Sequence, residues 1–327
     1  FLFKILEEVN AMWNSALTTG SSLVLDRRKF LAIAGGLVAA GVLPKQALAL
    51  AAPYTFKQGN YDVTVVSDGT LMLPVAMIFP DAPAEDVKKL LGAVVDGDKA
   101  QFQVNVLLLK SGSETILIDT GTGGGFQPSA GTLMESIKAA GSDAGAVTKV
   151  IYTHAHGDHI AGTAGKDGLN FPNATYHMAE TEWNFWSPPD LASKMPKEME
   201  GMILGIQSQM TAIKDKVSFF KPGAEIVSGL AAIDTAGHTP GHVSFEMAGG
   251  DGLILTGDAI TNAAVFFPHP DWKFSFDADH AAASANRRKL LDMASSAKKK
   301  LLGYHWPYPG IGMAEAKDGA WVFVPQA

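Results

Sequence analysis

The heptapeptide Thr153–His159, THAHGDH in one-letter code, decides how the rest of the chain is interpreted. It follows Lys149–Tyr152 (KVIY), an apolar and β-branched run that is typical of the end of a buried strand. A tight turn that leaves a strand can direct alternate side chains to one point, and imidazole and carboxylate groups are good ligands for zinc and its neighbours. The stretch therefore predicts a catalytic metal site rather than a chance cluster of solvated histidines.

The composition narrows the class of protein. The chain has 327 residues, of which 47% are hydrophobic and 18% charged, and this balance is typical of a folded globular protein. The net charge of −7, without a basic stripe, argues against a nucleic-acid partner. The absence of cysteine excludes disulfides, thiolate metal ligands and a cysteine nucleophile. We expect a small-molecule substrate as the partner, and a homodimer is left open.

Residues 1–51 resemble a twin-arginine export signal. The pair Arg27–Arg28 precedes the apolar and glycine-containing run Leu31–Leu43, which is short for a permanent membrane span. Small residues follow, so that cleavage after Ala49 or Ala51 is expected. We therefore predict a periplasmic protein that is exported by the twin-arginine machinery. A membrane anchor or a buried first helix are the alternatives.

Three other predicted strands also end in metal-ligand chemistry. A strand before Thr235 leads into the histidine-containing loop GHTPGH at 237–242, and Leu253–Gly257 ends at a carboxylate. A last short strand ends at a histidine. The candidate ligands on these loops are His242, Asp258 and His305.

Four other features of the sequence bear on the site or the fold. Asp119 ends the predicted strand 115–118, and we expect its carboxylate to hydrogen-bond the loop of histidines. The glycines at 123–125 lack the spacing and the lysine of a phosphate-binding loop. Trp186 and its aromatic neighbours belong either to the core or to a wall of a substrate pocket. The spacing from Leu290 to Leu301 predicts one long helix.

The order of these motifs resembles the metallo-β-lactamase superfamily over almost all of residues 54–325. The resemblance implies an α+β fold, a four-layer αβ/βα sandwich with metals at one edge, and a single domain over residues 52–327. It also implies two divalent metal ions as cofactors, most commonly Zn²⁺.

The resemblance further implies a role for each candidate residue. One metal would be held by His154, His156 and His242, and the other by Asp158, His159 and His305. Asp258 would bridge the two metals, while Asp119 and His238 would support the ligands without touching a metal. A hydroxide shared by the metals would be the nucleophile. Asp258 and Asp158 are the predicted catalytic residues, and Asp258 would position the hydroxide and accept its proton.

Within the superfamily, the sequence is most similar to the methyl parathion hydrolases, which are periplasmic organophosphate triesterases. The similarity rests on VTVVSDGT at 63–70, FPNA at 171–174, GHTPGH at 237–242 and PGIG at 309–312. It implies phosphotriester or aryl ester substrates. Phe126 and Trp186 fall where those enzymes have aromatic pocket residues, and Met202 is the third expected pocket residue. Two positions depart from the pattern: Gly157 replaces an expected proline, and the Met202–Ile203 region is aliphatic where an aromatic residue is expected.

Other activities of the same fold remain alternatives. N-acyl-homoserine lactonases usually carry a tyrosine three residues after the bridging aspartate, where this chain has Thr261. A β-lactamase is disfavoured because those enzymes usually lack the aspartate of the histidine motif as a ligand. A non-catalytic metal-binding module is disfavoured because all seven implied ligands are present.

Overall fold

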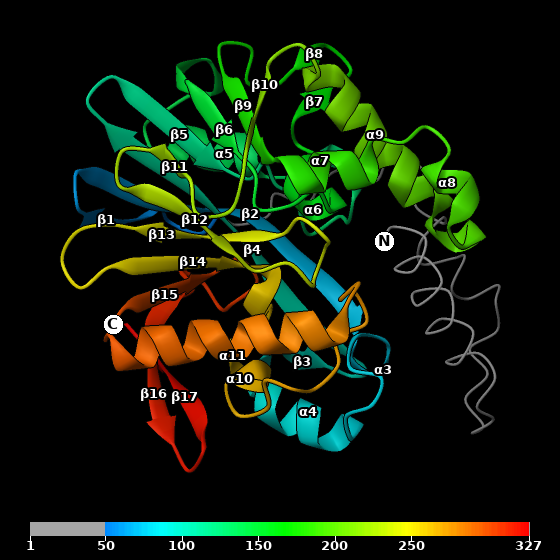
Figure 1. Cartoon of the computed structure of the whole chain (residues 1–327), viewed down its shortest axis with the longest axis vertical. Helices are drawn as coiled ribbons and strands as arrows, with labels where there is room; N and C mark the ends of the chain where they lie inside the picture. The colour runs from blue at the N-terminus through cyan, green and yellow to red at the C-terminus, as the bar shows by residue number, and fades with distance from the viewer. Residues whose placement is uncertain (1–49, 327) are drawn as a thin grey trace.

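Two β-sheets packed face to face form the centre of the structure, a computed structural model that describes residues 50–326 (Figure 1). Strand β4 (Lys99–Ser111) shows how the sequence builds this arrangement. Its Leu107 and Leu109 enter the core between the sheets, whereas Val106 and Leu108 enter a second core under the outer helices. Successive side chains of a strand point to opposite faces, so both faces of β4 are covered.

The first sheet contains eight strands, seven of them in the order β1-β2-β4-β5-β6-β9-β10, with β3 paired to β4. Strands β5, β6, β9 and β10 run parallel, so their carboxyl ends meet at one edge. The bounds besides those of β4 are β1 (Tyr54–Gln58), β2 (Tyr61–Pro74), β3 (Val95–Asp96), β5 (Glu114–Ile118), β6 (Lys149–Ile151), β9 (Thr175–Ala179) and β10 (Val217–Phe220).

The second sheet contains seven strands in sequence order, from β11 to β17. Its central pair, β14 and β15, is parallel, and their carboxyl ends point to the same edge of the sandwich as those of β6 and β9 (Figure 1). The bounds are β11 (Glu225–Val227), β12 (Leu230–Asp234), β13 (Val243–Met247), β14 (Leu253–Gly257), β15 (Lys300–Gly303), β16 (Ile311–Lys317) and β17 (Ala320–Pro325). Strands β7 (Ala164–Gly165) and β8 (Gly168–Leu169) form a separate small hairpin.

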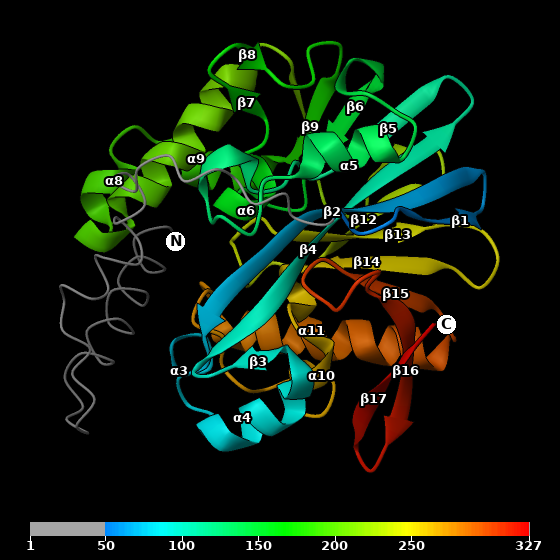
Figure 2. The ribbon, with the colours of Figure 1, turned by 180° about the vertical axis from the view of Figure 1, so that it is seen from behind.

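Helices cover the outer faces of both sheets, so the predicted four-layer sandwich is confirmed. Figure 1 shows α11 along the second sheet, and Figure 2 shows α5 against the first. The helices are α3 (Val75–Ile78), α4 (Ala84–Leu91), α5 (Leu133–Ala139), α6 (Gly157–Ile160), α7 (Glu180–Trp186), α8 (Leu191–Lys194), α9 (Glu200–Ile213), α10 (Ala263–Phe266) and α11 (His280–Ser296). Residues 50–326 also contain five 3₁₀ turns: η2 (Gly92–Val94), η3 (Gly123–Gly125), η4 (Ala144–Ala146), η5 (Lys197–Met199) and η6 (Asp258–Ile260).

One helix boundary differs from the prediction. The helical pattern predicted from Leu290 to Leu301 is interrupted, because α11 ends at Ser296 and Lys298 adopts a left-handed φ of 53°. Leu301 therefore belongs to β15, where it packs into the core under the helices. Hydrophobic spacing alone could not separate the helix from the buried strand that follows it.

The predicted export signal lies almost wholly outside the described residues, which begin at residue 50. That segment and the periplasmic location stay predictions. Within residues 50–326, no helix combines the length and the apolar character that crossing a membrane requires.

Candidate metal centre

The site lies at the edge of the sandwich where the parallel strands of both sheets end. The loop Thr153–His159, here called the histidine loop, follows β6, and its last residues form the first turn of α6. Asp258 follows β14 directly, and His305 follows β15 after one intervening residue. The two sheets therefore bring residues separated by about 150 positions to one point.

Asp119 holds the histidine loop from the adjacent strand end. Its carboxylate accepts hydrogen bonds from the backbone N–H and the hydroxyl of Thr153, and from Nδ1–H of His159, each at 2.8 Å. Asp119 is fully buried, and its φ of 63° is rare for a residue other than glycine. The strain is consistent with a role in orienting His159, whose Nε2 is left to face the centre.

The first ligand group contains His154, His156 and His238, whose ring nitrogens lie close enough together to share one metal ion. Nδ1 of His156 lies 2.9 Å from Nε2 of His238. The resemblance described above assigns His242 to this group and His238 to a supporting role. The structure instead places His238 in the group and His242 outside it.

His242 cannot act as a ligand in this arrangement because both of its ring nitrogens are already used. Its Nε2 accepts the backbone N–H of Asp258 at 2.9 Å, so its Nδ1 carries the proton and donates to the Thr235 hydroxyl at 2.9 Å. His242 is fully buried and supports the Asp258 loop from beneath. Because GHTPGH contains two histidines, the sequence alone does not show which of them faces the metal centre.

A buried ion pair orients His238. Nδ1–H of His238 donates to Asp277 at 3.1 Å, and the other Asp277 oxygen accepts from Arg287 at 3.1 Å. Arg287 is fully buried, donates to two backbone carbonyls and lies 3.8 Å over the Phe266 ring. A carboxylate behind a ligating histidine fixes its tautomer and leaves Nε2 as the free ligand atom.

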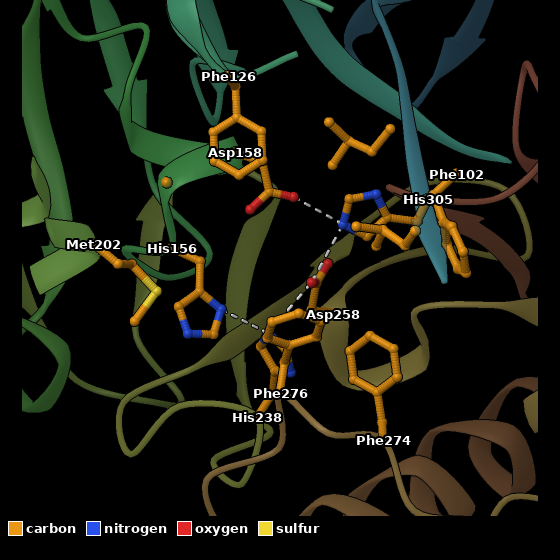
Figure 3. A pocket seen from close by; sticks show the side chains of 13 residues that line it. Phe102, Phe126, His156, Asp158, Met202, His238, Asp258, Phe274, Phe276 and His305 are labelled. Atoms are coloured by element: carbon orange, nitrogen blue, oxygen red, sulfur yellow. Dashed lines mark hydrogen bonds and ion pairs between the residues drawn. The ribbon is translucent and has the colours of Figure 1, made fainter. Parts of the chain in front are cut away.

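The second ligand group contains Asp158, His159 and His305. Nε2 of His305 lies 3.2 Å from an Asp158 oxygen, and His305 Nδ1–H donates to the Gln103 carbonyl at 2.7 Å. Asp258 lies between the groups: its oxygens are 3.3 Å from His238 Nε2 and 3.4 Å from His305 Nε2 (Figure 3). An Asp258 oxygen also lies 3.4 Å from His159 Nε2. Asp258 therefore lies close to residues of both groups, and its role as a bridge between two metals stays a prediction.

The donor atoms fit two divalent metal ions. Nε2 of His154, Nε2 of His159 and Oδ1 of Asp258 are buried without a hydrogen-bond partner, although buried polar atoms are rarely left so. A zinc–nitrogen distance of about 2.0–2.1 Å in a tetrahedral site places ligand atoms roughly 3.3–3.4 Å apart. The separations of 3.2–3.4 Å around Asp258 and His305 agree with that spacing.

The electrostatics differ between the two groups. Burial lowers the pKa of His156 to about 3 and that of His154 well below its usual value, so both rings are neutral and free to ligate. Burial opposes a charge on His305 as well, yet the Asp258 and Asp158 carboxylates raise its pKa to about 10. The carboxylates thus stabilise positive charge in the second group. In the metal-free protein a proton on His305 supplies this charge, and a bound dication would replace that proton.

A cavity opens directly onto these ligands (Figure 3). Two of the predicted pocket residues, Phe126 and Met202, line it. Its other apolar residues are Leu71, Leu73, Phe102, Phe274 and Phe276. Its floor is formed by ligands from both groups, and no lysine or arginine is among its lining residues.

Trp186 is a correction to the predicted pocket. It is 2% exposed, donates through Nε1 to Glu182 at 2.8 Å, and packs edge-on against the His156 ring, with 5.8 Å between the ring centroids. It therefore lies behind a ligand and is absent from the residues that line the cavity. Phe274 and Phe276 supply the aromatic wall instead, and no motif in the sequence distinguishes them from core residues.

Sequence reasoning also missed three buried charged residues that support the ligands, namely Glu182, Asp277 and Arg287. Glu182 lies in the segment ETEWNFW of α7, where the exposed Glu180 carries the same charge, so residue type alone did not single it out. Asp277 and Arg287 offered no signal either, because their pairing depends on the tertiary structure.

Comparisons with known proteins agree with this geometry. Residues 100–305 match the metallo-beta-lactamase superfamily. The chain is 28% identical over 181 residues to the uncharacterized protein YobT of Bacillus subtilis (strain 168), an overlap of 55% of this chain and 72% of that protein.

Two solved structures are similar over most of their length. The dizinc quorum-quenching lactonase AidC, solved with the product N-hexanoyl-L-homoserine, is 29% identical with a TM-score of 0.77, covering 84% of this chain and 97% of its own. The hydrolase AbOPH of the beta-lactamase superfamily is also 29% identical, with a TM-score of 0.78. The match covers 85% of this chain and 98% of AbOPH.

Proposed function

Because the chain belongs to the metallo-beta-lactamase superfamily and is a metal-dependent hydrolase, we propose that it hydrolyses neutral esters that carry an apolar substituent. The first candidate substrates are N-acyl-homoserine lactones. The observation that carries the proposal is the apolar cavity, whose floor includes Asp158, Asp258 and His305. We further propose that the two metal ions are Zn²⁺.

The cavity selects for a neutral substrate. Seven of its lining residues are apolar, four of them phenylalanines, and these side chains can bury an acyl chain or an aryl ring. A substrate carboxylate would find no lysine or arginine in the lining, so its desolvation would go uncompensated. The proposal therefore disfavours β-lactams, which carry such a carboxylate.

The chain's residues suit ester hydrolysis. When bound, two divalent ions would lower the pKa of water and polarise the acceptor oxygen of the substrate. Asp258 contacts ligands of both groups and faces the cavity, so its carboxylate can orient the attacking water and take its proton. Water adds to the carbonyl, the ring C–O bond breaks, and the released alkoxide takes up a proton. The product is the open-chain hydroxy acid.

The similarity to AidC favours lactones over phosphotriesters. AidC is a lactonase, and it is 29% identical over most of this chain. Thr261, which stands where other lactonases carry tyrosine, is fully buried and lies outside the cavity lining, so this chain would act without that hydroxyl. Neutral phosphotriesters are the second candidate, because Phe126, Phe274 and Phe276 offer faces for an aryl leaving group.

A substrate panel tests the proposal. We would compare kcat/KM of the zinc-loaded protein for N-hexanoyl-L-homoserine lactone, paraoxon, a phenyl ester and a penicillin, with Asp258→Asn as the background control. We expect the lactone to lead, the phosphotriester to follow and the penicillin to stay at background. A leading phosphotriester would establish the second candidate, and a leading penicillin would contradict the proposal.

A further inference from the structure

Glu182 is a fully buried carboxylate that faces neither the cavity nor a cation. It lies on α7, and no lysine, arginine or histidine of residues 50–326 forms an ion pair with it. Burying an ionised group is costly unless hydrogen bonds compensate the lost hydration. Burial accordingly raises the pKa of Glu182, and the hydrogen bonds of its neighbours oppose that rise. Such a residue needs a structural or functional reason.

The four hydrogen bonds of Glu182 join the two loops that carry the first ligand group. Oε1 accepts from the backbone N–H of Ala155 at 2.8 Å, between His154 and His156, and from Trp186 at 2.8 Å. Oε2 accepts from the Thr239 hydroxyl at 2.7 Å and from the backbone N–H of Gly241 at 3.0 Å, in the loop that carries His238. One carboxylate therefore ties the histidine loop to the His238 loop.

The packing of Gly241 shows how closely these parts fit. A Cβ at Gly241 would lie 2.1 Å from the backbone nitrogen and 2.5 Å from the Cα of Glu182. Backbone atoms cannot move aside as a flexible side chain can, so the His238 loop lies directly against the first turn of α7. Glu182 thus has a fixed position relative to both loops.

We propose that Glu182 is a positioning residue that sets the spacing between His156 and His238 and thereby the affinity of the first ligand group for a divalent metal. Nδ1 of His156 and Nε2 of His238 are 2.9 Å apart, and each loop is fixed beside its ligand by one oxygen of this carboxylate. The inference rests on the metal-binding part of the proposed function and not on the substrate.

Two substitutions of Glu182 separate position from charge. Glu182→Gln keeps the shape but has one acceptor oxygen, so its amide N–H must face at least one backbone or indole N–H. Glu182→Asp keeps the charge but withdraws the carboxylate by about 1.5 Å, beyond hydrogen-bond reach of at least one loop. Both variants should loosen one link if position is what matters.

Asp68 provides a matched control. It is also a fully buried carboxylate, and it accepts from the N–H and hydroxyl of Thr122 and from the N–H of Leu133 at 2.6–2.7 Å. Burial raises its pKa as well. Asp68 hydrogen-bonds neither the histidine loop nor the His238 loop, so Asp68→Asn should cost stability without a specific effect on metal binding.

The test is a zinc titration of the metal-free proteins against a chromophoric chelator, with thermal unfolding measured in parallel. We expect Glu182→Gln and Glu182→Asp to weaken one of the two zinc-binding steps by roughly 10–100-fold. Asp68→Asn should weaken zinc binding by less than about 3-fold at a comparable loss of Tm. Wild-type affinity in Glu182→Asp, or an equal loss in Asp68→Asn, would overturn the inference. A wild-type protein that binds no zinc would instead refute the proposed function.

Discussion

The two sides of the metal centre are built in different ways. The histidine loop supplies four candidate ligands from one short segment, and their directions follow from the strand end and the turn that carry them. His238, Asp258 and His305, here called the C-terminal ligand set, come from three separate loops of the second sheet. They are oriented by distant groups, such as Asp277 and the Gln103 carbonyl. A local motif thus supplies the ligands of one half of the site, which Asp119 and Glu182 hold in place. The ligands of the other half are brought together only by the tertiary structure.

The largest effect is expected at the residue that joins the two sides. Asp258→Ala removes the carboxylate that lies 3.3–3.4 Å from His238, His159 and His305, and Asp258→Asn keeps its shape without its charge. We expect both to lower kcat/KM on the order of 10²–10⁴-fold and to reduce bound zinc below two equivalents. Kinetics and elemental analysis of the purified variants measure both effects. Full zinc content with full activity in Asp258→Asn would show that the two sides act independently.

The next prediction distinguishes the two histidines of GHTPGH. His238→Ala removes a ligand atom and should weaken zinc binding by more than the roughly 10–100-fold that loss of a supporting residue costs. His242→Ala leaves the Thr235 hydroxyl and the Asp258 N–H without their partner, which should cost about 1–3 kcal/mol of stability.

Zinc titration and chemical unfolding of both variants decide between the assignments. The structure predicts that His238→Ala loses much more zinc affinity than His242→Ala. The opposite order would restore the assignment made from the sequence and would mean that His238 only supports the site.

The same contrast explains what the sequence could predict. The histidine loop, Asp258 and His305 each lie within two residues of the end of an apolar strand, so periodicity and residue type identified them. The apolar run at 115–118 likewise predicted the strand that the structure shows as β5. The choice between His238 and His242 depends on Asp277 and Thr235, which the sequence does not connect to them. Trp186 was misplaced for a similar reason, since only the packing of α7 turns its ring behind His156.

A third prediction concerns the support of the C-terminal ligand set. Asp277→Asn leaves the fully buried Arg287 guanidinium without its charge partner and weakens the hydrogen bond to His238. Breaking a buried ion pair typically costs about 3–5 kcal/mol, and zinc affinity should fall roughly 10–100-fold.

The matched variant on the other side is Asp119→Asn, which is hydrogen-bonded to the histidine loop. Its partner His159 also lies near the carboxylates of Asp158 and Asp258, so this substitution leaves no buried cation without a charge partner. It should lose less stability than Asp277→Asn in urea unfolding of the metal-free proteins. Equal losses would show that the two halves depend on their supports to the same extent.

The smallest expected effect concerns the shape of the cavity beside the histidine loop. A Cβ at Gly157 would lie 3.1 Å from Cε2 of Phe126, so the absence of a side chain at Gly157 gives the Phe126 ring its place at the cavity wall. Gly157→Ala should displace the ring by a few tenths of an ångström and raise KM for apolar substrates by about 2–10-fold, the range expected for part of an aromatic contact. Zinc content should stay unchanged, because neither residue supplies a ligand atom.

The double variant tests whether Gly157 acts through the Phe126 ring. Phe126→Ala should raise KM by itself and remove any further effect of Gly157→Ala, and steady-state kinetics of the double variant measure this coupling. Additive effects of the two substitutions would show that Gly157 acts on the neighbouring ligands and not through the ring.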